Sequence, residues 1–159
     1  MSERRAPVLV IGVGNELRGD DGAGIEVARR VRQLVDPGQI AVLEQHGEAL
    51  GLIEQWDGYR AALIVDAIGT GAHTGSLRRL DASSEPLPAD LRSSTSTHAV
   101  GVVETIELAR AIGRLPETLV VHGVQGEIFD TGSELSVAVR AAIGPLAEIV
   151  RCDAAGLVG

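Results

Sequence analysis

Four short runs of predominantly apolar residues, rich in Val and Ile, place the strongest constraint on how this chain can fold. They cover residues 8–13, 40–43, 61–65 and 119–124. Such runs are typical of strands that are buried on both faces of a sheet. Between them, apolar residues return at helical spacing, so strands and helices alternate. This alternation predicts an α/β fold, a three-layer α/β/α sandwich with a single mostly parallel, twisted sheet of about five strands.

The same patterns predict the remaining elements. Helical spacing indicates helices through residues 25–35, 50–56, 102–112 and 135–149. Residues 76–80 predict an edge strand. Residues 81–97 are rich in Ser, Pro and Asp and predict a long loop, a kind of segment that often carries function. No repeat or linker divides the chain. We therefore expect one domain over residues 1–159, with an ordered core at about 7–151 and a frayed tail from Asp153.

Charge and composition exclude several classes of partner. The chain carries 22 acidic and 14 basic residues, for a formal net charge of −8, and aromatic residues make up 2%. All the basic residues are Arg. Binding to a phosphate backbone needs a cationic face, and binding single strands by stacking needs aromatic side chains. We therefore expect no nucleic-acid partner.

Targeting signals and cysteine usage point to the cytoplasm. No stretch approaches the roughly 20 apolar residues that span a bilayer, and the first apolar run is too short for a signal peptide. The single cysteine, Cys152, excludes an intrachain disulfide framework and a Cys-based zinc site. We expect a reduced cytoplasmic monomer that has no membrane association.

Three polar residues fall where functional sites form in parallel sheets, at the carboxyl ends of the strands. Asp21 follows the first strand, Asp66 follows the third, and His98 ends the long loop. Asp20 is the alternative to Asp21, and either can simply cap a helix, as His98 can. A carboxylate at the end of a buried strand, such as Asp66, needs a partner, a ligand or a cleft. Together, two carboxylates and an imidazole suit nickel, zinc or iron, and the carboxylates can also act as general acid and base.

Two other chemistries are weaker. The first loop, GVGN, begins like a dinucleotide-binding motif, but Leu17 occupies the third glycine position. Asp20 and Asp21 would also repel a pyrophosphate at the following helix. A serine nucleophile is disfavoured, because Ser94 and Ser96 lie outside any G-x-S-x-G motif.

Several segments, read in order, resemble the hydrogenase maturation proteases. They are GVGNELRGDDGAG, LIVDAIGTG, STHAVGVVETIELARAIGRLP, LVVHGVQG and residues 130–136, and the resemblance covers about residues 8–149. It implies a nickel-dependent endopeptidase, aspartic-type or metal-assisted, that removes the C-terminal extension of a NiFe-hydrogenase large-subunit precursor after metal insertion. The metal-contacting residues of the family fall on Asp21, Asp66 and His98, and the two aspartates are the catalytic candidates. The resemblance also implies that the precursor supplies the nickel and that the free enzyme holds it weakly.

The chain departs from the family pattern at two places. EQHGEALG replaces a segment of the Asp-Gly-Gly-Thr type, so the role of that acid stays open among Glu44, His46 and Glu48. Gly126 stands where Pro is common. Three alternatives remain: a nickel-sensing checkpoint or chaperone without peptidase activity, a Rossmann-like nucleotide-binding domain, and a peptidyl-tRNA hydrolase-like enzyme.

Structural or solvent-exposed roles are expected for the other polar residues considered. Cys152 is expected to pack or to be an incidental thiol, His73 to be exposed, and His122 to be hydrogen-bonded inside a buried strand. The Arg29-Arg30 and Arg78-Arg79 pairs are expected on solvated faces.

Overall fold

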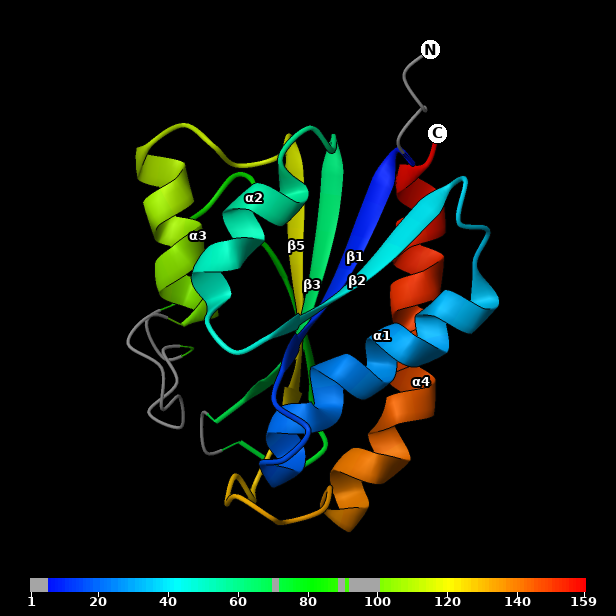
Figure 1. The fold of residues 1–159 in the computed structure, drawn as a ribbon, viewed down its shortest axis with the longest axis vertical. Helices are drawn as coiled ribbons and strands as arrows, with labels where there is room; N and C mark the ends of the chain where they lie inside the picture. The colour runs from blue at the N-terminus through cyan, green and yellow to red at the C-terminus, as the bar shows by residue number, and fades with distance from the viewer. Residues whose placement is uncertain (1–5, 70–71, 89–90, 92–100) are drawn as a thin grey trace.

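A computed structural model describes residues 6–69, 72–88, 91 and 101–159. Within these residues one sheet is formed by β1 (Val8–Gly14), β2 (Ile40–His46), β3 (Ala61–Ile68), β4 (Leu77–Asp81) and β5 (Thr118–Gln125). The strand order is β2-β1-β3-β5-β4 (Figure 1). Every neighbouring pair is parallel except β4 and β5, which run antiparallel. The predicted α/β class, the mostly parallel sheet and the edge strand are therefore confirmed.

Helices cover both faces of the sheet, as predicted (Figure 1). One face carries α1 (Ala23–Leu34) and α4 (Val137–Leu157), and the other carries α2 (Leu52–Trp56) and α3 (Val102–Ala111). Two short 3-10 helices, η1 (Gly19–Gly22) and η2 (Ala49–Gly51), precede α1 and α2. None of the helices in the described part of the chain is both long enough and apolar enough to cross a membrane.

The apolar core forms two layers, one on each side of the sheet. Along β3, Ile64 and Ile68 pack on the side of α2 and α3, whereas Leu63 and Val65 pack on the side of α1 and α4. This alternation follows from the two-residue period of a strand. It places Asp66 on the same side as Ile64 and Ile68.

Three local expectations need correction. The helix predicted through residues 50–56 is shorter, because a 3-10 turn precedes α2. Asp20 and Asp21 lie within η1, and α1 begins only after Gly22, so neither aspartate caps α1. The chain does not fray from Asp153, since α4 continues to Leu157 and Asp153 bonds to buried His122.

Candidate functional site

The loop that carries Asp21 folds back onto the end of β1. The N–H of Asn15 donates to the carbonyl oxygen of Asp21 at 3.1 Å. Gly14 makes this possible, because a Cβ at its position would lie 1.9 Å from that same oxygen. Only a residue without a side chain allows such a close approach. Asp21 is thereby held at the carboxyl edge of the sheet, the edge at which β3 also ends.

Asp66 is the one partly exposed residue of a strand that is otherwise buried. Burial raises the pKa of the Asp66 carboxyl well above its ordinary value, and repulsion from the Asp21 carboxylate adds to the rise. The hydrogen bond from the backbone of Ala67 lowers the pKa but does not outweigh these two effects. The two carboxylates therefore interact across the edge of the sheet, and a cation between them would relieve their repulsion.

Asp21 is the more open of the two neighbouring aspartates. Its side chain is 20% exposed, and its Oδ2 lies 3.5 Å from Nη1 of Arg18. Sequence reasoning overlooked Arg18, although its spacing of three residues from Asp21 was a usable signal. An accessible carboxylate beside one guanidinium can still bind a cation or a peptide group.

Asp20 has a closed environment. It is fully buried, and its Oδ2 accepts hydrogen bonds from the N–H groups of Glu127 and Ile128, at 2.8 and 3.0 Å. The Oγ of Ser136 donates to the same oxygen at 2.9 Å, and the N–H of Ser136 donates to Oδ1 at 2.7 Å. Protein donors thus occupy both oxygens of Asp20, so this carboxylate, unlike that of Asp21, is not available to a ligand.

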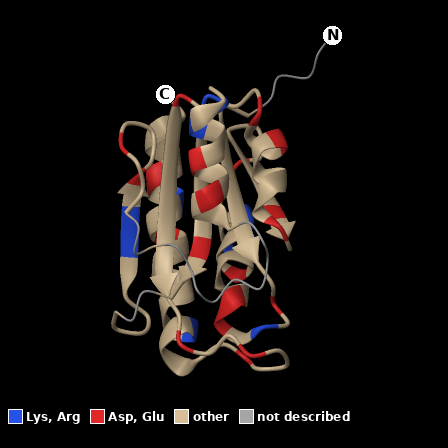
Figure 2. Ribbon diagram, turned by 90° about the vertical axis from the view of Figure 1, so that its left-hand side faces the viewer, with Lys and Arg blue, Asp and Glu red and all other residues tan. Residues whose placement is uncertain are grey.

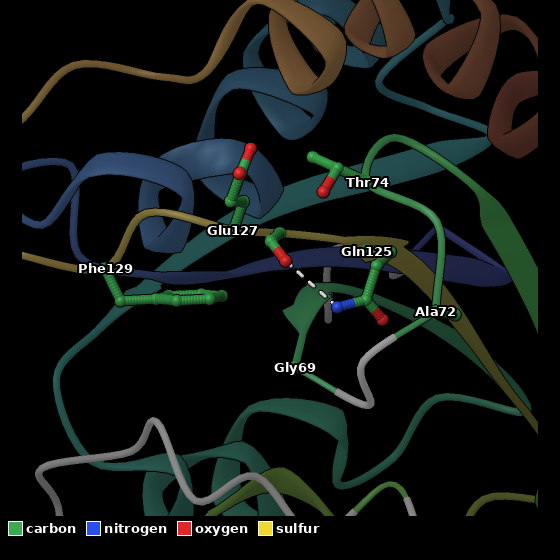
Figure 3. A pocket seen from close by; sticks show the side chains of 7 residues that line it. Gly69, Ala72, Thr74, Gln125, Glu127 and Phe129 are labelled. Carbon is green, nitrogen blue, oxygen red and sulfur yellow. Dashed lines mark hydrogen bonds between the residues drawn. The ribbon is translucent and has the colours of Figure 1, made fainter.

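A hollow of about 360 Å³ lies beside these residues, where β3 and β5 end (Figure 3). Its lining comes from three short segments: Gly69, Ala72, Thr74, Gln125, Gly126, Glu127 and Phe129. Gln125 is turned toward its own strand end, where its Nε2 donates to the carbonyl of Gly126 at 2.9 Å. Sequence reasoning named none of these residues as lining a pocket. Their position after two buried strands was the available signal.

Loops with an excess of negative charge surround the site. Figure 2 shows acidic residues on the loops at this end of the molecule. Residues 126–136 contribute Glu127, Asp130 and Glu134, and residues 15–22 contribute Glu16 and Asp21 beside Arg18, whereas Asp20 is buried. Such a rim favours a substrate segment or ligand of positive charge.

Comparison with known proteins identifies the family. The family profile described as hydrogenase maturation protease matches residues 25–152. The chain belongs to the hydrogenase maturation protease family.

Relatives align along most of the chain. The hydrogenase 2 maturation protease of Escherichia coli is 27% identical over 145 residues, which are 90% of this chain and 87% of that protein. The hydrogenase expression/formation protein HoxM of Cupriavidus necator is 30% identical over 139 residues, 86% of this chain and 68% of that protein. The structure of the E. coli hydrogenase maturating endopeptidase HybD matches with a TM-score of 0.76 at 27% identity, covering 92% of this chain and 90% of that one.

The third expected metal ligand of this hydrogenase maturation protease homologue, His98, lies outside the described residues, as do Ser94 and Ser96. Among the residues that are described, no three His, Cys, Asp or Glu side chains gather as a metal site would require. Asp21 and Asp66 are oxygen donors on one edge of the sheet, and their chemistry suits a divalent cation whose other ligands come from elsewhere.

Glu44, one of the three residues among which the role of the family's acid stays open, is engaged in ion pairs. Its carboxylate oxygens lie 2.9 Å from Arg32, 3.1 Å from Arg29 and 3.2 Å from Nε2 of His46. Burial alone would raise the pKa of Glu44, but the hydrogen bonds from these three residues outweigh it and lower the pKa to about 2. Arg29 also donates two bonds of 2.9 Å to Glu16 in the first loop. Arg29 thus links β2 to the first loop. The sequence alone predicts a solvated side chain at this position.

The remaining polar residues have structural or surface positions. His122 bonds to Asp153 at 2.8 Å, which confirms its predicted structural role. His73 is exposed, as predicted. Arg79 is not simply solvated, since it donates to Asp153 at 2.9 and 3.1 Å. Cys152 is exposed and not packed.

Proposed function

We propose that this chain is a nickel-dependent endopeptidase that removes the C-terminal extension of a NiFe-hydrogenase large-subunit precursor after the metal has been inserted. The observation that carries the proposal is the pair of interacting carboxylates, Asp21 and Asp66, at the carboxyl edge of the sheet. Family membership supplies the reaction class. We further propose that the chain acts in the cytoplasm as a monomer.

Nickel enters this scheme as part of the substrate. Asp21 and Asp66, together with His98, would contact the nickel that the precursor already holds. The metal supplies a fixed docking point and Lewis acidity near the peptide bond to be cleaved. Without a cation, the two carboxylates repel each other across the edge of the sheet. A metal-free precursor offers the two carboxylates no cation to bind, so cleavage depends on metal insertion.

The residues of the chain itself bind and orient the precursor. The hollow beside Gln125 and Phe129 offers room for a side chain of the extension, and the acidic rim attracts a basic segment. After docking, either Asp21 or Asp66 can accept a proton from the attacking water at a carboxylate oxygen. Such general-base catalysis is typically worth about 100-fold to 10,000-fold in rate.

The test uses nickel-loaded and nickel-free precursor, with mass spectrometry to detect the loss of a C-terminal peptide. We expect cleavage of the nickel-loaded form alone. Asp21→Asn, Asp66→Asn and His98→Ala should each reduce the rate by at least about 100-fold. Asp57→Asn is the matched control, because Asp57 is 69% exposed and follows α2 at the opposite edge of the sheet. It makes the same charge change and should retain wild-type activity.

A second candidate function, a checkpoint without peptidase activity, predicts a different result. Nickel-dependent binding of the precursor without cleavage would replace the peptidase proposal with the checkpoint. Absence of both binding and cleavage with a cognate precursor would overturn both.

A further inference from the structure

We infer that Asp20 is a positioning residue whose buried carboxylate fixes the loop between β5 and α4 against η1. It thereby holds Asp21 and one wall of the hollow in a single arrangement. The effect expected on cleavage rests on the proposed function, whereas the anchoring of the loop does not.

The hydrogen bonds to Asp20 belong to a longer set of cross-links between these two segments. The N–H of Asp20 donates to the carbonyl of Ile128 at 2.7 Å, and the N–H of Gly19 donates to the carbonyl of Ser133 at 3.0 Å. In the opposite direction, the N–H of Gly132 donates to the carbonyl of Leu17 at 2.7 Å. Residues separated by more than 100 positions are thus joined backbone to backbone, with the Asp20 side chain at the centre.

Two glycines allow the segments to lie this close. A Cβ on Gly19 would stand 2.4 Å from the carbonyl oxygen of Ile128, and Gly19 also has a positive φ of 58°. A Cβ on Gly126 would stand 2.9 Å from the Cβ of Asp20 and 2.6 Å from Cζ of Phe129. Gly126 therefore lies against both the Asp20 side chain and the ring of Phe129, which lines the hollow.

The carboxylate charge is what suits Asp20 to this task. Three donors meet its Oδ2 and one meets its Oδ1, so all four bonds require acceptor oxygens. An asparagine has the same shape but places an N–H donor on one side. In either orientation of the amide, that donor would face at least one backbone N–H. Asp20→Asn therefore replaces at least one hydrogen bond to the loop with repulsion between two donors, and it leaves no cavity.

Release of the loop would affect catalysis more than binding. Asp21 follows Asp20 directly, and Glu127 and Phe129 belong to the released segment. Small displacements of reacting groups reduce rates strongly. We expect Asp20→Asn to lower kcat by at least about tenfold, while KM for the nickel-loaded precursor changes by less than about threefold.

The experiment combines kinetics with amide hydrogen exchange on the full-length protein. Exchange at the amides of Glu127, Ile128 and Ser136 should be at least about tenfold faster in Asp20→Asn. Ser136→Ala removes one of the four bonds and should give a smaller change in the same direction. Val150→Ala is the control, because it removes core volume on α4 roughly four turns from Ser136. It should lower the melting temperature but leave these amides and kcat unchanged when the protein is folded.

Two results would overturn the inference. The first is that the three amides in Asp20→Asn exchange at the wild-type rate. The second is that they exchange faster but the variant keeps the wild-type kcat. A wild-type protein that fails to cleave nickel-loaded precursor would overturn the proposed function instead, and the exchange measurement would still decide whether Asp20 anchors the loop.

Discussion

The carboxylate of Asp20 accepts four hydrogen bonds and is closed to solvent, whereas that of the adjacent Asp21 is 20% exposed, with Arg18 at 3.5 Å. A buried acid that meets only donors stabilises the backbone around it. A partly exposed acid near a second acid is suited to binding a cation. At the scale of single residues, surroundings and not residue type decide which aspartate serves the site.

The same reasoning applies to Glu44, whose substitution by Gln should lower the free energy of unfolding by about 1–2 kcal/mol at pH 7 after allowance for solvent screening. Burial raises the pKa of Glu44, but the hydrogen bonds from Arg32, Arg29 and His46 outweigh this effect. Together they lower the pKa from 4.5 to about 2. A carboxyl whose pKa is lower in the folded state contributes stability above about pH 4.5, and this is lost as the pH falls toward 2. Urea unfolding should show a full difference between wild type and Glu44→Gln at pH 7 and almost none near pH 2.

Glu48→Gln provides the matched control for this measurement. Glu48 is exposed, and its backbone carbonyl accepts a bond from Gln45 that the substitution leaves intact. We expect a change below about 0.5 kcal/mol. Equal losses in the two variants would contradict the assignment of the ion-pair network to Glu44.

At the scale of elements, the position of α1 decides where the first loop can lie. A Cβ on Gly12 of β1 would stand 2.2 Å from the carbonyl oxygen of Gly24, and a Cβ on Gly24 would stand 2.3 Å from that of Val65. The first turn of α1 thus lies directly on β1 and β3, backbone against backbone. Since η1 leads into α1 without a break, this close packing also sets the distance from Asp21 to β3.

Gly24→Ala should therefore lower both stability and activity. The added Cβ would meet two strand carbonyls, of Val65 at 2.3 Å and of Val13 at 2.5 Å, so α1 must move away from the sheet. We expect a loss of about 2–3 kcal/mol in urea unfolding, together with a lower kcat for cleavage by the folded protein. Gly144→Ala on α4 is the control, because its Cβ would meet nothing closer than Nη1 of Arg30 at 3.4 Å. That variant should be neutral or more stable by up to about 1 kcal/mol, and a similar loss in both would contradict the packing argument.

At the scale of the whole molecule, local patterns predicted the architecture but not the contacts that complete the site. The apolar run at residues 8–13 predicts nearly all of β1, because burial on both faces leaves a strong local signal. β2 extends past the predicted residue 43 to His46, since Glu44 lies within the strand and is paired with Arg29. The partners of Asp20 lie more than 100 positions away, and no local pattern predicts them. Sequence reasoning therefore preferred Asp21 to Asp20 without the contacts that distinguish the two residues.

A second long-range connection joins the sheet to the end of the chain. Buried His122 on β5 bonds to Asp153 on α4, and Arg79 on β4 donates two bonds to the same carboxylate. Three elements thus meet at the Asp153 carboxylate, in the part of α4 for which the sequence predicts a frayed tail. Because α4 also covers the apolar face of the sheet beside α1, this connection stabilises the whole fold.

This connection makes the stability of the protein depend on pH near neutrality. Burial lowers the pKa of His122 below 6.5, and the hydrogen bond and charge of Asp153 oppose the shift without cancelling it. The folded state therefore holds fewer protons than the unfolded chain, so stability is full above about pH 6.5 and falls as the pH drops below it. One such group gives a slope of at most about 1.4 kcal/mol per pH unit in urea unfolding between pH 8 and 5.

His122→Asn should be less stable at pH 8 and should lose this part of the slope, whereas His73→Asn, an exposed control, should keep it. An unchanged slope in His122→Asn would assign the pH dependence to other groups.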